Sequence, residues 1–138
     1  MLLEALVTTD RADHETNYYV QPQTGISCAE IIGDLPFNIG CIIKYVWRHE
    51  NKNGKRDVEK AIQYAKIEIE ASRDIDFGLL VSNVKSKFQI IEKYAEFEKK
   101  TYKADIFRTC INYIQRGEMG CLYQIIDDLE TVLKIEYP

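Results

Sequence analysis

The residues best suited to binding or catalysis form a basic cluster in the first half of the chain. Between residues 44 and 66, seven lysines and arginines stand against three acidic residues, so this window carries a net charge of +4. The whole chain of 138 residues carries −4. A local concentration of cations favours a small anionic ligand. The acidic remainder would repel a phosphate backbone, so long nucleic acid is not an expected partner.

These side chains are spaced so that two neighbouring helices could direct them into one groove. Gly40, Lys44 and Arg48 recur every four residues and therefore share one face of a helix. Lys60 and Tyr64 share one face of the following helix in the same way. If the two helices form a hairpin, both faces border one groove.

Such a groove would suit a nucleotide or another small phosphorylated ligand. Arg48 could grip a phosphate through two hydrogen bonds, and Lys44 and Lys60 could act as point charges. Gly40 leaves room for a ligand against the helix backbone. Tyr64 or Trp47 could stack on a base, a contact worth about 1–3 kcal/mol.

An interpretation without a ligand stands beside this one. Arg48 and Asp57 could form a salt bridge that closes the hairpin, contributing about 0–1 kcal/mol if it is exposed. Lys44 and Lys60 could be ordinary solvated residues, and Trp47 could belong to the core. Charge spacing alone favours this second interpretation.

The elements that must position these residues are predicted to be helices. The stretch SCAE is a capping box, with Ser27 at the N-cap and Glu30 three residues later, and the short helix it opens should end at Gly33. Pro36 suits the first turn of the next helix, which should run to about His49. The polar stretch NKNG then predicts a turn.

Apolar residues repeat at helical spacing through the rest of the chain, and strand-like alternation is nowhere sustained. The stripes are Val58, Ile62, Ala65 and Ile69; Val81, Val84, Phe88, Ile91 and Ala95; Phe107, Cys110 and Ile114, ended by Gly117; and Leu122, Ile126, Leu129 and Leu133. The sequence therefore predicts an all-α helical bundle of five or six helices, with an N-terminal basic helical hairpin followed by C-terminal helices. We expect two parts, 1–72 and 73–138, joined near the stretch SRDIDFG.

Composition and motifs argue against a membrane, secreted or metal-binding protein. No stretch approaches the roughly 20 apolar residues of a membrane span, and the N-terminus lacks the pattern of a signal peptide. We therefore expect a cytoplasmic protein with no membrane partner. The two histidines, His14 and His49, have no ligand spacing relative to the cysteines, so no metal site is predicted. The cysteines should be reduced thiols; they are Cys28, Cys41, Cys110 and Cys121.

The string GISCAEII…FNIGCIIKYVWRHENKNGKRDVEKAIQYAKIEIE resembles a small domain family carried mainly by phages. The family occurs in SaV-like early proteins and in a coliphage nucleotide kinase that lacks a P-loop. The resemblance covers about residues 17–70. The family pattern G-N-x-x-K-Y-x-x-R, then K-N-G-x-x-D-L-x-K-A-x-x-Y, is matched at Gly40, Lys44, Tyr45, Arg48, Lys52, Asn53, Gly54, Asp57, Lys60, Ala61 and Tyr64. The chain departs from it at Ser27, Glu30 and Cys41.

The resemblance implies a nucleotide-binding protein, with a helical SaV-like domain over residues 1–72. The nucleotide-binding residues it implies are Gly40, Lys44, Arg48, Lys52, Lys60 and Tyr64. If catalysis is retained, it implies phosphoryl transfer to a deoxynucleoside monophosphate, with Mg²⁺ accompanying the nucleotide. Lys44, Arg48 and Lys60 would then neutralise the transferring group. Asp57 would orient Arg48 or the nucleophile. The basic residues are kept while several polar residues differ, which favours binding over catalysis.

Two other functions stay open. The protein could be a non-enzymatic phage early protein that binds a host or defence protein in the host cytoplasm. The apolar stripes after residue 77 would suit such a surface, a homo-oligomer contact or a plain core. An all-α nucleoside triphosphate pyrophosphatase would need acidic helical pairs that hold Mg²⁺. The local candidates, Glu68 with Glu70 and Asp127 with Asp128, lack the expected E-x-x-E and E-x-x-D arrangement.

Overall fold

The computed structural model describes residues 19–71 and 83–138 and is helical almost throughout them. Six α-helices and one short 3₁₀ helix lie in this part of the chain, which confirms the predicted all-α bundle of five or six helices. The elements are α3 (Cys28–Ile32), α4 (Phe37–Arg48), η1 (His49–Asn51), α5 (Lys55–Ala71), α6 (Val84–Ala95), α7 (Thr101–Arg116) and α8 (Met119–Glu136). A single antiparallel bridge joins Val20 to Ser27.

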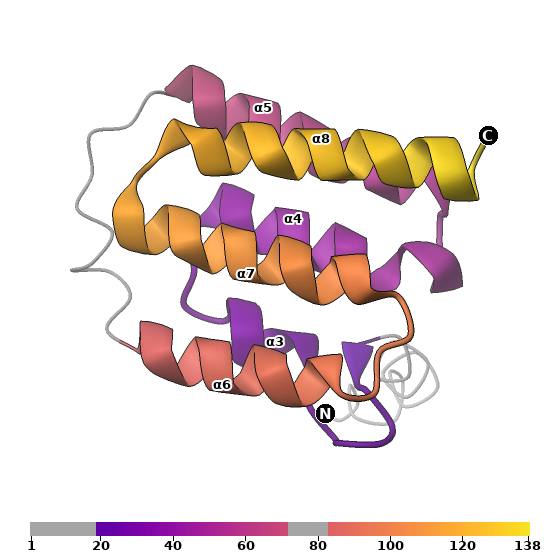
Figure 1. Cartoon of the computed structure of the whole chain (residues 1–138), viewed down its shortest axis with the longest axis vertical. Helices are drawn as coiled ribbons and strands as arrows, with labels where there is room; N and C mark the ends of the chain where they lie inside the picture. Colours follow the sequence, from indigo (N-terminus) through magenta and orange to yellow (C-terminus); the bar gives the residue numbers. More distant parts are fainter. Residues whose placement is uncertain (1–18, 72–82) are drawn as a thin grey trace, which may run out of the picture.

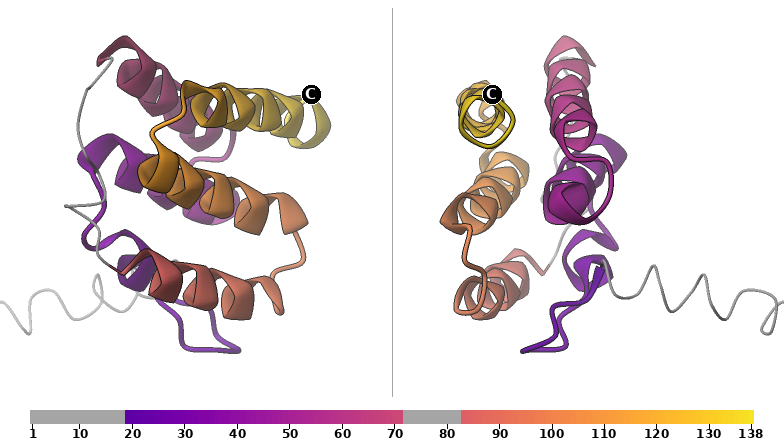
Figure 2. Two further views of the ribbon diagram at one scale, coloured as in Figure 1. Left: turned by 60° about the vertical axis from the view of Figure 1, so that its left-hand side comes forward. Right: turned by 90° about the vertical axis from the view of Figure 1, so that its right-hand side faces the viewer.

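The helices form two layers of three, seen edge-on in the right-hand view of Figure 2. Helices α3, α4 and α5 lie side by side in the N-terminal layer, and α6, α7 and α8 lie side by side in the C-terminal layer (Figure 1). Across the interface, α3 contacts α6, α4 contacts α7 and α5 contacts α8. The basic hairpin predicted from the sequence is the α4–α5 pair.

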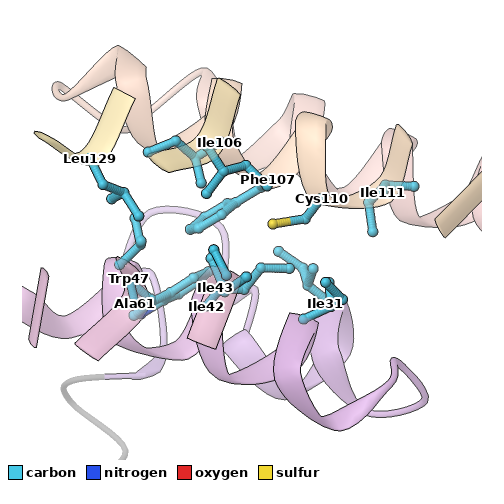
Figure 3. Close-up of a cluster of buried hydrophobic side chains, with 14 of the residues drawn as sticks. Ile31, Ile42, Ile43, Trp47, Ala61, Ile106, Phe107, Cys110, Ile111 and Leu129 are labelled. Carbon is cyan, nitrogen blue, oxygen red and sulfur yellow. The ribbon is translucent and has the colours of Figure 1, made fainter. Parts of the chain in front are cut away.

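The hydrophobic core lies between the two layers, and both layers contribute to it. Figure 3 shows Ile43 and Trp47 of α4 facing Phe107 and Cys110 of α7, with Leu129 of α8 beside them. Apolar residues on both helices of the hairpin are buried; they are Ile43, Val46, Val58, Ile62 and Ala65, the last three from the predicted stripe. The division at residue 72 stays a prediction, because residues 72–78 lie outside the described part. Val81, the first residue of the second predicted apolar stripe, also lies outside it.

The residues predicted to mark the ends of α3 and α7 are found at those ends. The Ser27 hydroxyl accepts a hydrogen bond from the backbone N–H of Glu30, and the Glu30 carboxylate accepts one from the N–H of Ser27, which completes the capping box. Gly33 caps the end of α3. Gly117 ends α7 in the left-handed conformation, with φ of 70°.

The predicted apolar stripe of α8 needs a correction. Leu122 and Leu129 are buried, but the positions between and after them are Ile125 and Val132 rather than Ile126 and Leu133. Apolar residues occur at both members of each neighbouring pair, so the 3–4 spacing fits either face. Contacts with α5 and α7 select the face that is buried.

Two buried lysines tie the layers together. Lys87 of α6 donates to the backbone oxygen of Glu30 at 2.9 Å and pairs with Asp34 at 2.7 Å. Lys103 of α7 donates to the backbone oxygen of Trp47 at 3.0 Å and pairs with Glu50. Each buried ammonium thus replaces its hydrogen bonds to water with bonds to acceptors in the N-terminal layer. None of the helices in the described part is long and apolar enough to cross a membrane.

Candidate functional site

Several predicted site residues converge on the ring of Tyr45, on the outer side of the α4–α5 hairpin. The guanidinium carbon of Arg48 lies 4.7 Å from the ring centroid of Tyr45, and Nζ of Lys60 lies 5.9 Å from it. The ring of Tyr64 stacks on that of Tyr45, with centroids 5.8 Å apart and planes at 15°. We call Lys44, Tyr45, Arg48, Lys60 and Tyr64 the Tyr45 face.

Lys44 joins this face through Tyr19. Its Nζ lies 5.8 Å from the ring centroid of Tyr19, whose hydroxyl accepts a hydrogen bond from Nη1 of Arg48 at 2.9 Å. Cys41 lies one turn before Lys44 on α4, close to Tyr64. Burial raises the pKa of Cys41, so a neutral thiol stands at this position, not a nucleophilic thiolate.

Arg48 and Asp57 form a buried ion pair that closes the hairpin. Nε of Arg48 donates to Oδ2 of Asp57 at 3.2 Å, and Nη2 donates to Oδ1 at 3.1 Å. Asp57 is fully buried and also accepts from the backbone N–H of Asn53 at 3.2 Å. Burial alone would lower the pKa of Arg48, but the bonds to Asp57 and Tyr19 outweigh it and raise the pKa, so the guanidinium stays charged.

This pair corrects the roles expected for its two members. Three of the five N–H donors of Arg48 are used by Asp57 and Tyr19, and the residue is only 8% exposed, so little of the guanidinium is open to a phosphate in this conformation. Both carboxylate oxygens of Asp57 are occupied, and water has no access to them. Asp57 is therefore not placed to take a proton from a substrate. It positions Arg48, and through it Tyr19.

Gly40 and Lys52 lie away from the Tyr45 face. Gly40 is buried, and a Cβ added there would meet Ile32 of α3 at 3.8 Å, so α3 occupies the space in which a ligand was expected. Lys52 is exposed in the turn before Gly54, and the structure shows no ring or ion-pair contact between it and the Tyr45 face. The structure thus brings together four of the six predicted binding residues, which are Lys44, Arg48, Lys60 and Tyr64. Of these, Arg48 is bonded to Asp57 and Tyr19.

Most cations of the hairpin have no ion-pair partner among the described residues. Within residues 44–66, Arg48 is the only lysine or arginine in an ion pair with a described partner. Basic residues of the C-terminal layer are paired more often, as at Lys87, Lys100, Lys103 and Arg108. Lys44 and Lys60 therefore keep their charge available for an external anion.

Sequence reasoning missed a buried polar network around His49, at the other end of the hairpin. Nδ1 of His49 lies 2.7 Å from the hydroxyl of Tyr137, and Nε2 lies 2.8 Å from that of Tyr102. Both ring nitrogens of His49 thus have a tyrosine hydroxyl as partner. Burial lowers the pKa of His49, which favours the neutral imidazole.

The structure gives no support to a Mg²⁺ site built from acidic pairs. Glu68 is buried and accepts hydrogen bonds from Asn38 at 3.0 Å and Tyr113 at 2.8 Å, while Glu70 is exposed. Among the residues described, histidine, cysteine, aspartate and glutamate nowhere gather in threes as a metal would require. The four cysteines are free thiols.

Comparison with known proteins finds similarity to one family model over part of the chain. Residues 26–66 match the family model of DUF3310, a protein of unknown function, which covers less than half of the chain. The match spans α3, α4 and most of α5 and includes the whole Tyr45 face. No curated protein and no solved structure matches the chain. The resemblance to phage-encoded SaV-like proteins stays a prediction.

Proposed function

We propose that the protein binds a nucleotide or another small phosphorylated ligand on the Tyr45 face. The observation that carries this proposal is the convergence of Lys60, Arg48 and Tyr64 on one tyrosine ring. Lys60 and the neighbouring Lys44 have no acidic partner among the described residues. The resemblance of this segment to a phage-encoded nucleotide kinase supports the same ligand class.

In the proposed complex, Lys44 and Lys60 meet the phosphates as point charges, and a base stacks on Tyr64. Arg48 stays bonded to Asp57 and adds positive potential behind the Tyr45 ring. Mg²⁺ would arrive with a di- or triphosphate, because the described residues of the face offer no free carboxylate. Binding is favoured over phosphoryl transfer for the same reason: among the described residues, no free base lies beside these cations.

Calorimetry with deoxynucleoside mono- and triphosphates tests the proposal. We expect Lys44→Ala and Lys60→Ala each to weaken binding, and the double variant to weaken it tenfold or more with the fold intact. Lys134→Ala, an exposed lysine of α8, is the matched control and should bind as the native protein does. Absence of heat with every nucleotide, at protein concentrations well above micromolar, would contradict the proposal.

A second candidate is a protein-binding surface on the same hairpin, for a host protein or a second copy of the chain. Phe37 is 73% exposed and meets the ring of Tyr64 edge-on at 5.9 Å, and Ile67, one turn further along α5, is 42% exposed. Phosphate groups make no favourable contact with these apolar side chains. If this candidate holds, Ile67→Ser should weaken self-association in sedimentation experiments and leave nucleotide affinity unchanged, because Ile67 is not part of the Tyr45 face.

A further inference from the structure

The surface around Tyr45 differs in chemistry between the two ends of the α4–α5 hairpin. Helix α4 runs toward the turn at residues 52–54 and α5 runs back from it, so the start of α4 lies beside the second half of α5. Phe37 and Tyr64 meet at that end, whereas Arg56 stands in the first turn of α5, at the other end. A ligand lying along the hairpin would therefore meet aromatic rings at one end and cations at the other.

The end far from the turn is an aromatic corner. The rings of Phe37 and Tyr64 lie 5.9 Å apart between centroids, with 73° between their planes. Phe37 is 73% exposed, so its ring is open to a ligand. A nucleobase in this corner would stack on one ring and lie against the other, which would remove apolar surface from water.

Cations continue from this corner toward the turn along α5. Arg56, Lys60 and Tyr64 are each four residues apart, so they share one face of the helix, with about 6 Å of rise between neighbours. Arg56 and Lys60 are both exposed. Arg56 is not one of the nucleotide-binding residues predicted from the sequence.

Neighbouring carboxylates do not offset the positive charge on this line. Neither Arg56 nor Lys60 has an ion pair with a described residue, and the buried Asp57 is paired with Arg48, so those two charges cancel. Glu59 lies on the other side of α5, where it lines a depression between α5 and α8. Two positive charges are thus left over along α5, which suits a ligand with several negative charges.

We propose that nucleotides bind along the hairpin in one direction, with the base at Phe37 and Tyr64 and the phosphates toward Arg56, and that Arg56 selects triphosphates over monophosphates. This inference rests on the proposed function of the Tyr45 face. The single phosphate of a monophosphate ends near Lys60, whereas the phosphate chain of a triphosphate continues toward the turn and reaches Arg56. The guanidinium then binds the terminal phosphate through two hydrogen bonds.

Calorimetry on the full chain with dAMP and dATP, both without divalent cations, tests the role of Arg56. We expect the native protein to bind dATP at least tenfold more tightly than dAMP. Arg56→Ala should weaken dATP binding at least fivefold and change dAMP binding less than twofold, with circular dichroism unchanged. Lys55→Ala is the matched control, because it removes the same charge from the neighbouring exposed residue, which lies off the shared face. It should change both affinities less than twofold.

Inorganic tripolyphosphate, which has no base, tests the direction of binding. Phe37→Ala should weaken dAMP and dATP binding by the same factor, at least fivefold, and leave tripolyphosphate binding unchanged. Arg56→Ala should weaken tripolyphosphate binding as it weakens dATP binding.

Four results would overturn the inference: equal native affinities for dAMP and dATP, an equal loss of both in Arg56→Ala, a loss of dATP binding in Lys55→Ala as large as in Arg56→Ala, or unchanged nucleotide binding in Phe37→Ala. Nucleotide binding that responds to Lys44→Ala and Lys60→Ala, but not to Arg56→Ala, would overturn this inference and leave the proposed function standing. Absence of binding by every nucleotide would overturn both.

Discussion

At the scale of single residues, the Arg48–Asp57 pair should contribute more to the stability of the fold than to ligand binding. Removing one member leaves the other charge buried without its partner, which costs about 3–5 kcal/mol. We expect Arg48→Ala to lower the free energy of unfolding by that amount in urea titrations, whereas Lys60→Ala, on the exposed part of the same face, changes it by about 0.5 kcal/mol or less.

The double replacement Arg48→Met with Asp57→Leu separates charge from packing. It should recover most of the loss, because no unpaired charge is left inside. An Arg48→Ala variant as stable as the native protein would show that water reaches the pair. Lysine variants are therefore the cleaner test of ligand binding.

His49 should give the protein a pH-dependent stability. Burial lowers its pKa below the usual value near 6.5, so the unfolded chain takes up a proton at a pH where the folded protein does not. The unfolded state then binds more protons, and stability falls as the pH drops below about 6.5, by at most about 1.4 kcal/mol per pH unit. The titratable groups around it are Glu50, Lys100, Tyr102, Lys103, Glu136 and Tyr137.

Unfolding measured at pH 7.5 and 5.5 checks this expectation. The difference in free energy between the two pH values should be smaller in His49→Gln than in the native protein, since glutamine does not titrate. Equal differences in the two proteins would assign the pH dependence to the acidic residues instead.

At the scale of elements, two glycines in the left-handed region allow turn strain to be separated from packing. Gly54 has φ of 54°, and a Cβ there would lie 3.3 Å from the ring of Tyr137, whereas Gly117 has φ of 70° and open space around it. Gly117→Ala should cost about 1 kcal/mol from backbone strain alone. Gly54→Ala should cost more, because the Tyr137 ring must also move.

Thermal unfolding of both alanine variants, in native and Tyr137→Ala backgrounds, measures the two contributions. The excess cost at Gly54 should disappear without the ring. An excess that persists would mean that the turn itself, and not its contact with the C-terminus, sets the cost.

The helices could be predicted from the sequence because their signals are local. A capping box, a glycine after the last turn and a 3–4 apolar spacing each act within a few residues. The buried partners of Lys87 and Lys103 could not be predicted, because they lie more than fifty positions away along the chain. Spacing placed Lys60 and Tyr64 on one face, but the central place of Tyr45 depends on how α5 packs beside α4.

At the scale of the whole molecule, each layer buries its apolar face against the other. Trp47 of the N-terminal layer stacks with Phe107 of the C-terminal layer at 6.1 Å and with Tyr94 at 4.6 Å. A three-helix layer that lost these neighbours would expose its inner face to water. Its own contacts would then have to offset the conformational entropy of ordering about half of the chain.

We therefore expect residues 1–72, expressed alone, to lack a cooperative unfolding transition and to show the red-shifted emission of a solvated Trp47. Adding residues 73–138 should restore helicity beyond the sum of the two fragments and shift the emission to the blue, because the core forms only when both layers meet. The same C-terminal fragment carrying Phe107→Asp should fail to do so, since the charge would be buried against Trp47. A cooperative transition in the isolated N-terminal fragment would instead show that the layer is an independent domain, and that the Tyr45 face can form without the C-terminal helices.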